Sequence, residues 1–466
     1  MNLDIIKEVE NRVAGGYGKV AAKEPLFNKW KRVVATFLVN EQAAYNNAAT
    51  VKSLLKLSKE VSDNPRFSSW INTVRNDFGL RHAPLIAYTG ALLKYGQKPK
   101  DVTIWRTPKD VVDNAAFLFT LKGNFTKKFK KDISKVVTNF DEYQMSKYKN
   151  YNANGWRLVD VINLTHPKPT EAINKLIKGE LKKPETWEHL ISNLPQGKTR
   201  KDVWEDLIKN NKLGALALLK NLRNMIKDNV DEKLLIDYIY QKDFGLIFPF
   251  QIINGYKEIY NYNNKIAKVL ISKLYSPNPI LGGKTLIILD VSGSMGSFNL
   301  MAHYTDNMAS KALGVFFSIV NNTIDKDIVL TAGSDSEGKH KSMFINEKLV
   351  KKPLNFSKLI NNDVRNKIGY GGIFTKQCLK WVEDEKGKSV YDRIVIISDS
   401  QDCDRYDRGD KLPTSLLKKG GKIYVNNIAA YSNVGYTSLN DGVQIEIPTF
   451  SSKVADLIRF EEEFKE

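Results

Sequence analysis

The chain has 466 residues, and its 71 Lys and Arg side chains outnumber its 52 Asp and Glu side chains, giving a formal charge of +19 with His neutral. Hydrophobic residues make up 42% of the chain and charged residues 26%, an ordinary globular composition that argues against wholesale disorder. The two cysteines, Cys378 and Cys403, exclude a disulfide framework and a four-cysteine zinc site, so we expect a reducing compartment.

The N-terminal segment MNLDIIKEVENRV mixes both charges and lacks an apolar core, so it is not expected to be a secretory signal. The longest apolar runs, such as Leu246–Ile253, are far shorter than the ~20 residues that a membrane helix needs. We therefore expect a soluble, cytoplasmic, monomeric protein of two to three domains without a membrane partner.

Residues 1–283 are predicted to form short helices in series, because apolar residues recur at helical spacing and Pro or Gly residues separate the segments. The predicted helices are Trp30–Val39, Thr50–Val61, Phe67–Phe78, Pro84–Lys94, Pro108–Leu121, Lys127–Phe140, Thr170–Lys178, Asp202–Lys209, Gly214–Ile226 and Glu232–Tyr240. Short helices with short links are typical of an α-solenoid built from degenerate helix pairs.

The pattern changes near Ser276–Gly283. Lys284–Asp290 and Arg393–Ser398 are continuous apolar runs typical of buried parallel strands. Further strands are predicted at Asp327–Ala332, Ser342–Asn346, Lys422–Ala429 and Val443–Ile447, and helices at His303–Asn321, Thr375–Glu385, Thr414–Lys419 and Ser452–Phe464. This alternation predicts a doubly wound, Rossmann-like α/β domain, so we divide the chain into a helical module (1–275) and an α/β domain (276–466).

The positive charge is unevenly distributed. Residues 1–283 hold 46 basic and 28 acidic residues, a net charge of +18, whereas residues 284–466 hold 25 and 24, a net charge of +1. This asymmetry indicates a polyanionic partner for the helical part. The alternative is the solvated surface of a lysine-rich protein.

Oxygen side chains gather where the first strand of the α/β domain ends. Asp290, Ser292 and Ser294 alternate in a glycine-containing loop, and Asp399 ends a second strand. Oxygen ligands select hard cations, so these residues predict a site for Mg²⁺, with Mn²⁺ or Ca²⁺ as alternatives. The other interpretation is that the serines cap the next helix and Asp290 is a turn acid.

The spacing of these residues resembles the metal-ion-dependent adhesion site of von Willebrand factor A domains, written Asp-x-Ser-x-Ser, then Thr, then Asp. In those domains the Thr directly follows a Gly-Gly pair, but here Gly371-Gly372 is followed by Ile373, and Thr375 is the nearest candidate ligand. A nucleophilic serine needs a nearby base, and His303 is the one histidine near these loops in the sequence. We interpret the site as binding rather than catalytic and expect no enzyme.

The segment Lys147–Pro169 (KYKNYNANGWRLVDVINLTHPKP) resembles the "K-Y-x-x-R-x-G-W-S-H-x-D-x-x-R-L-S-H-x-K-P" stretch of the Ro ribonucleoprotein family, whose members join a TROVE module to a von Willebrand A domain. Shorter segments in the same order also resemble this family: Gly79–Leu85, Asp202–Glu205, Ala217–Met225 and Pro249–Ile253. The resemblance implies HEAT-like helical repeats closed into a ring, with the von Willebrand A domain joining the ends of the ring.

The resemblance also implies a function. Members of the family bind small noncoding Y-type RNA on the ring's outer surface and single-stranded 3′ ends of misfolded RNA through its hole, acting as RNA chaperones that can recruit an exoribonuclease. The candidate RNA-binding residues here are Arg81, Lys127, Lys128, Lys130, Lys131, Lys147, Lys149, Arg157 and Lys168. Arg157-Leu158 replaces the family's Ser-His pair, so Arg157 is the candidate phosphate contact at that place.

Aromatic residues near these cations have two interpretations. Tyr148, Tyr151 and Trp156 would stack unpaired bases if they are exposed, and they belong to the core if they are buried. His166 is expected to be a packing or capping residue. Two other functions are weighed: a metal-dependent scaffold that binds acidic partner residues through the Asp290 site, and a nuclease, for which the sequence shows no paired-metal acid cluster.

Overall fold

The computed structural model describes residues 26–36, 51–94, 99–182, 184–274, 279–298, 308–334, 337–351, 353–404, 411–429, 442–447, 449, 451 and 453–463. The chain divides into two compact units. We call residues 26–40 and 49–213 the helical unit. The sheet unit contains residues 214–466, with 1–25 and 41–48 assigned to it.

The described residues of the helical unit form helices alone, apart from turns and one isolated β-bridge. The helices are α2 (Leu26–Thr36), α3 (Val51–Val61), α4 (Phe67–Asn76), α5 (His82–Leu92), α6 (Pro108–Lys122), α7 (Lys127–Val137), α8 (Glu142–Tyr148), α9 (Leu158–Thr165), α10 (Glu171–Lys178), α11 (Trp187–Ser192) and α12 (Arg200–Lys209). Threonines start several of them: the hydroxyls of Thr107, Thr126 and Thr170 accept backbone N–H groups of the first turn. The predicted helices of this region are confirmed, while residues 37–39 and Thr50 lie outside the described residues.

Four further helices belong to the sheet unit, namely α13 (Ala215–Lys227), α14 (Glu232–Gln241), α15 (Pro249–Tyr260) and α16 (Asn264–Ile271). Helix α15 packs against α17 (Met308–Asn322), and a Cβ added at Gly314 of α17 would lie 2.8 Å from Cβ of Pro249. Because this contact ties the last helices of the solenoid to the sheet, the compact units divide at Leu213 and Gly214, whereas the sequence predicts a boundary near residue 275.

The sheet has six strands in the order β3-β2-β1-β4-β5-β6. Their bounds are β1 (Leu281–Asp290), β2 (Thr323–Ser334), β3 (Lys339–Ile345), β4 (Tyr391–Ser398), β5 (Leu417–Asn427) and β6 (Gln444–Glu446). All neighbours are parallel except β3, which is antiparallel to β2. Chain order reverses between β1 and β4, so their carboxyl ends border the crevice where open α/β sheets bind ligands.

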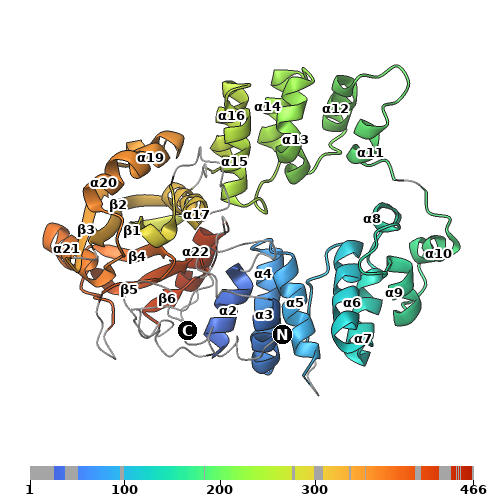
Figure 1. The fold of residues 1–466 in the computed structure, drawn as a ribbon, viewed down its shortest axis with the longest axis horizontal. Helices are drawn as coiled ribbons and strands as arrows, with labels where there is room; N and C mark the ends of the chain where they lie inside the picture. The colour runs from blue at the N-terminus through green and yellow to red at the C-terminus, as the bar shows by residue number, and fades with distance from the viewer. Residues whose placement is uncertain are drawn as a thin grey trace. The chain divides into compact units, whose positions relative to one another are not determined.

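Helices cover the sheet and connect its strands (Figure 1). Besides α17 they are α18 (Glu347–Val350), α19 (Pro353–Leu359), α20 (Arg365–Ile368), α21 (Thr375–Lys386) and α22 (Val454–Glu463), with a π-helical turn at Ile360–Val364 and 3₁₀ turns at Ser272–Leu274 and Gly293–Met295. The predicted fold class, a helical solenoid followed by a doubly wound α/β domain, is confirmed. Closure of the helices into a ring stays a prediction.

One predicted helix is wrong. Residues Thr414–Lys419 form a turn that leads directly into β5, because Leu417 pairs with Tyr391 of β4 and Leu416 is buried in the core beside the sheet. Strand pairing therefore overrides the local helical spacing. The first residues of the predicted helix His303–Asn321 lie outside the described residues, and α17 follows from Met308. Within the described part of the chain, no helix is long and apolar enough to span a bilayer.

Candidate nucleic-acid interface and candidate metal centre

The exposed face of α7 carries a stripe of lysines. Apolar residues Phe129, Ile133 and Val137 recur every fourth residue and are buried. Lys127, Lys131 and Lys135 recur with the same spacing, are exposed, and lie on the opposite face because ~100° separates successive residues of an α-helix. We call these three residues the lysine stripe. Like charges four residues apart destabilise a helix by ~0.2–0.5 kcal/mol per pair, so the stripe does not serve stability.

The remaining lysines of α7 differ in their surroundings. Lys128 forms an ion pair of 2.6 Å with Asp132 and is 19% exposed, so much of its charge is neutralised within the helix. Lys130 is partly exposed. The sequence singled out Lys127, Lys128, Lys130 and Lys131 as one run but missed Lys135, which only the spacing of the buried residues would have revealed.

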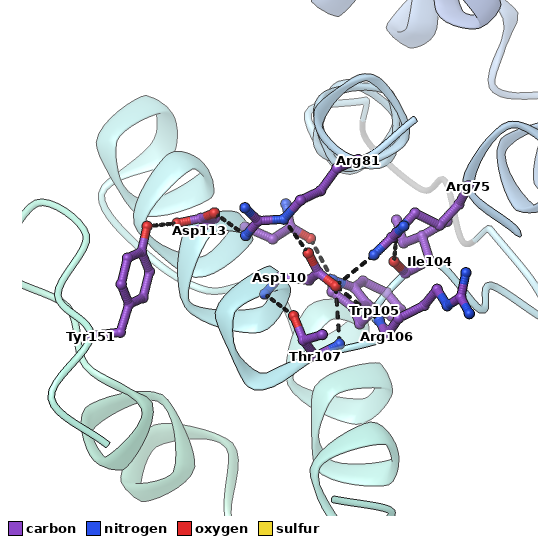
Figure 2. Close-up of polar contacts among 10 residues, drawn as sticks. Arg75, Arg81, Ile104, Trp105, Arg106, Thr107, Asp110, Asp113 and Tyr151 are labelled. Carbon is purple, nitrogen blue, oxygen red and sulfur yellow. Dashed lines mark hydrogen bonds and ion pairs between the residues drawn. The ribbon is translucent and has the colours of Figure 1, made fainter. Parts of the chain in front are cut away.

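Arg81 belongs to a buried ion-pair network at the start of α6 (Figure 2). Its Nε donates to Oδ1 of Asp110 at 2.6 Å, and its Nη2 donates to Oδ2 of Asp113 at 2.5 Å. Arg75 donates to Oδ2 of Asp110 at 3.0 Å. Figure 2 shows Asp110 at the centre of these contacts. Because two of its three guanidinium nitrogens donate to carboxylates, Arg81 holds helices together rather than offering a free cation.

Asp110 has more partners than the two arginines. The backbone N–H groups of Arg106 and Thr107 each donate to its Oδ2 at 3.0 Å, which completes the cap of α6. Its side chain is fully buried. Burial raises the pKa of the Asp110 carboxyl, but the charges and hydrogen bonds of Arg75 and Arg81 outweigh burial and leave this pKa below its ordinary value.

The loop between α8 and α9 is anchored at both ends. At its start, the Tyr151 hydroxyl donates to Oδ1 of Asp113 at 2.5 Å. At its end, the Trp156 ring lies 4.8 Å from the ring of Phe119 and 5.0 Å from that of Phe125. Trp156 is therefore a member of an aromatic cluster, although it remains partly exposed.

Other predicted RNA residues lie on the surface around this loop. Lys147 and Lys168 are exposed. Lys149 is partly buried and donates to the carbonyl oxygen of Leu181 at 3.2 Å. Arg157 is exposed and lies 3.4 Å from Asp160 of its own helix, a pairing that water screens.

Two further predicted residues have defined places. Tyr148 is partly buried, and burial raises the pKa of its hydroxyl. His166 caps the end of α9 with a left-handed backbone (φ 46°), as its predicted capping role requires.

The positive charge is more concentrated than the sequence division indicated. The helical unit holds 33 basic and 17 acidic residues, a net charge of +16 out of +19 for the chain. Residues 214–283, which the sequence grouped with the basic part, contribute only +3. The unit that carries the lysine stripe is therefore the basic one.

In the sheet unit, the loops after β1 and β4 bring the predicted metal ligands together. Asp290 is buried and accepts a hydrogen bond from the Ser398 hydroxyl at 2.7 Å and from the backbone N–H of Ser292 at 2.8 Å. The hydroxyl oxygens of Ser292 and Ser294 lie 3.2 Å apart. Asp399 is also buried. Four of the five predicted ligands thus converge at one edge of the sheet.

The charge balance of this site fits a cation. Burial raises the pKa of Asp399 to about 7, and the neighbouring Asp290 carboxylate adds to the increase. Burial also raises the pKa of Asp290. Oδ2 of Asp399 is buried without a hydrogen-bond partner in the described structure. A hard cation would satisfy this oxygen and relieve the repulsion between the carboxylates.

Thr375, the fifth predicted ligand, is buried at the start of α21 and is engaged by Asp402. Its backbone N–H donates to Oδ2 of Asp402 at 3.2 Å, and its hydroxyl also hydrogen-bonds this carboxyl. The pKa of Asp402 is raised to about 8 by burial and by the charge of Asp404. Among the described residues, no group of three or more His, Cys, Asp or Glu side chains is arranged to hold a metal ion.

Several residues around this site escaped the sequence analysis. Arg365 donates to the carbonyl oxygens of Gly296 and Ser292, at 2.9 and 3.2 Å, and so holds the metal-site loop. Elsewhere in the sheet unit, His340 places its Nδ1 3.0 Å from the Ser342 hydroxyl on β3. Of the two cysteines, Cys378 is buried and Cys403 is partly exposed.

Comparison with known proteins places part of the chain in a family. Residues 177–269 match the TROVE domain model, and this stretch runs from α10 to α16. The mouse protein "Telomerase protein component 1" is 33% identical over 119 residues, and its rat counterpart is 30% identical over 100 residues. These matches cover 24% and 20% of this chain and 4% of each relative, so the chain spans a small part of their length.

A solved structure, that of the Ro (RSR) protein of Deinococcus radiodurans, aligns with 94% of this chain and 99% of its own at 13% identity, with a TM-score of 0.49. The residues that resemble Ro proteins in sequence, Asp202–Glu205, Ala217–Met225 and Pro249–Ile253, lie inside the matched TROVE region. On the domain match, residues 177–269 of the chain form a TROVE domain.

Proposed function

We propose that this protein binds RNA through its helical unit, taking small noncoding RNA of the Y-like type and the single-stranded 3′ ends of misfolded RNA for quality control in the cytoplasm. The observation that carries the proposal is the lysine stripe, Lys127, Lys131 and Lys135. No carboxylate pairs with these three ammonium groups among the described residues. A row of unpaired like charges lowers the stability of the helix, but its ammonium groups can bind the phosphates of an RNA backbone.

The rest of the helical unit supports the same ligand. Its net charge of +16 gives long-range attraction for a polyanion, and partly exposed aromatic rings lie in the α8–α9 loop near its cations. The TROVE domain at residues 177–269 supports RNA binding too, because the Ro family that the sequence resembles consists of ribonucleoproteins. Arg81 is no longer among the residues we assign to RNA, because its guanidinium is paired with Asp110 and Asp113.

The test is RNA affinity as a function of salt. Fluorescence anisotropy with a labelled single-stranded RNA would be measured for the wild type and for Lys127→Gln/Lys131→Gln/Lys135→Gln. Loss of three phosphate contacts should reduce the slope of log K against log salt by about 2, at ~0.7 per contact on a single strand. A matched control, Lys348→Gln/Lys380→Gln/Lys419→Gln, removes the same charge from exposed lysines of the sheet unit.

Equal slopes for the stripe variant and the control would refute the stripe as the interface. Absence of wild-type binding at every salt concentration would refute the proposed function. Sequencing of RNA that co-purifies with the protein would then separate Y-like RNA from fragments of misfolded RNA.

As a second function, we propose that the sheet unit holds Mg²⁺ and presents it to an acidic side chain of a protein partner, an exoribonuclease being the partner that the family resemblance suggests. Asp290, Ser292, Ser294 and Asp399 would hold the ion. The unpartnered Oδ2 of Asp399 is the observation that favours this proposal. The proposed Mg²⁺ site is a binding site rather than a catalytic one.

Calorimetric melting with and without Mg²⁺ tests the metal site. Since a ligand that binds only the folded state raises its stability, Mg²⁺ should raise the melting temperature of the wild type and of the control Asp384→Asn, whose carboxylate is exposed on α21. The same titration should leave Asp399→Asn unchanged. No Mg²⁺ effect on the wild type would refute the site.

A further inference from the structure

The partly exposed ring of Tyr151 differs from the other tyrosines that anchor the helical unit. Tyr88, for example, is fully buried and donates its hydroxyl to Asp132 at 2.6 Å. Tyr151 makes a comparable hydrogen bond to Asp113, yet its ring stays accessible at the surface. A hydroxyl tied into a network and a ring left open are the features of a preorganised contact surface.

The Lys109 ammonium lies over the Tyr151 ring, 4.5 Å from its centroid. No carboxylate pairs with this ammonium among the residues that the structure describes. A cation on one face of an aromatic ring is attracted by the ring's quadrupole and is thereby held in place. The result is an unpaired positive charge beside an accessible aromatic ring, which is the chemistry that binds a phosphate and its base.

The acid next to this ring would repel phosphate if it were unpaired. Asp113, however, gives one oxygen to Arg81 and the other to the Tyr151 hydroxyl. Arg81 is in turn fixed by Asp110 at the cap of α6. Figure 2 shows this chain of contacts running from Asp110 through Arg81 and Asp113 to the Tyr151 hydroxyl. The buried network thus neutralises Asp113 and orients the ring.

The loop that follows Tyr151 is also rigid. Ala153 and Trp156 exchange backbone hydrogen bonds of 2.9 Å in both directions. Gly155, between them, has φ +86°, a conformation that other residues rarely adopt, and its N–H donates to the Asn152 side chain at 2.8 Å. Trp156 then packs on Phe119 and Phe125. An ordered loop loses little entropy when a ligand binds.

We propose that Tyr151 and Lys109 form a subsite for one unpaired nucleotide, with the base stacked on the Tyr151 ring and the phosphate bound by Lys109. Asp113 is a positioning residue that acts through Tyr151. This inference rests on the proposed RNA-binding function and deepens it, because it assigns a selective element: a duplex keeps its bases stacked internally and cannot offer one to the ring.

The experiment compares two probes within each protein, a single-stranded RNA and the same strand with its bases removed. In the wild type the strand with bases should bind more tightly. In Tyr151→Leu the ratio of the two affinities should fall roughly 5- to 150-fold, the range for loss of one base–aromatic stack. Because the ratio is taken within one preparation, a reduced folded fraction cancels.

Three further variants define the contacts. Tyr151→Phe should keep most of the ratio, because the ring remains, and should lose the part that depends on the hydrogen bond to Asp113. Lys109→Gln should reduce the salt slope by about 0.7 without changing the ratio. The matched control is Tyr143→Leu, which removes another exposed tyrosine, on α8, and should change neither quantity.

An unchanged ratio in Tyr151→Leu would overturn the subsite while leaving RNA binding by the lysine stripe intact. An equal fall of the affinity ratio in Tyr143→Leu would also overturn the subsite, because base stacking would then not be specific to the Tyr151 ring. Failure of the wild type to bind either probe would overturn the proposed function itself, and the subsite with it.

Discussion

Replacement of Asp110 by Asn should destabilise the helical unit more than any exposed charge change. Asp110 is fully buried, and its carboxylate accepts hydrogen bonds from Arg75 at 3.0 Å and Arg81 at 2.6 Å. The amide has nearly the same shape, so the substitution removes charge without creating a cavity. It leaves two guanidinium groups facing an amide, and Arg75 is only 10% exposed.

The expected cost is ~3–5 kcal/mol, the range for breaking a buried ion pair by removal of one partner. For a unit of this size, that corresponds to a fall in melting temperature of roughly 6–20 °C. The matched control is Asp206→Asn, which breaks an ion pair with Lys198 whose two side chains are each 46% exposed. Water screens an exposed pair, so the control should melt within a few degrees of the wild type.

The pH dependence has a definite sign. The pKa of Asp110 is lowered in the folded state, so its stabilisation is present above the pKa of the unfolded chain and is lost as the pH falls through the folded value. The difference between wild type and Asp110→Asn should therefore be full at neutral pH and shrink below about pH 4.

Scanning calorimetry would measure both proteins across this pH range, and hydrogen exchange would locate the loss in α5 and α6. The reasoning is refuted if Asp110→Asn costs no more than Asp206→Asn, or if the difference between wild type and variant persists unchanged in acid.

Three more predictions concern other parts of the chain. Replacing Lys127, Lys131 and Lys135 by Gln should stabilise α7 by up to ~1 kcal/mol, because two repulsive contacts between lysines four residues apart disappear, while RNA affinity should fall. A chemical denaturation midpoint lower than that of the wild type would contradict this. Gly293→Ala should cost ~1–3 kcal/mol and abolish the Mg²⁺-induced rise in melting temperature, because its Cβ would lie 2.5 Å from the Tyr370 carbonyl oxygen; melting curves unchanged from those of the wild type would show that the loop adapts. Burial lowers the pKa of Lys311 to about 7, so the sheet unit should gain stability as the pH rises from 7 towards 9, and Lys311→Met should flatten that dependence; equal pH profiles would disprove the assignment.

Local patterns were sufficient for much of the fold. The spacing of buried residues, Phe129, Ile133 and Val137 in α7 for instance, together with threonine caps, predicts where helices lie, because both act within a few residues of the chain. The convergence of Asp290 and Asp399 was likewise predictable. Parallel strands deliver their carboxyl ends to one edge of a sheet, whatever the details of packing.

Contacts between distant segments were decided only by tertiary structure. Arg81 was a reasonable RNA ligand by sequence, but Asp110 and Asp113 lie on another helix and occupy it. Thr375 is engaged by Asp402, a pairing between loops 27 residues apart. Helix α15 packs against α17, and the compact units divide after Leu213, whereas the sequence predicts a domain boundary near residue 275.

The sequence alone therefore determined which residue types this protein offers: a basic helical part, oxygen ligands at strand ends, and aromatic residues among cations. The tertiary structure decided which of them are free. Lys127 and Lys131 remain unpaired on a helix surface while Arg81 is neutralised, and Tyr151 keeps an accessible ring while Trp156 joins a cluster. The physical reason is that pairing depends on distance in space, which composition and spacing along one segment do not contain.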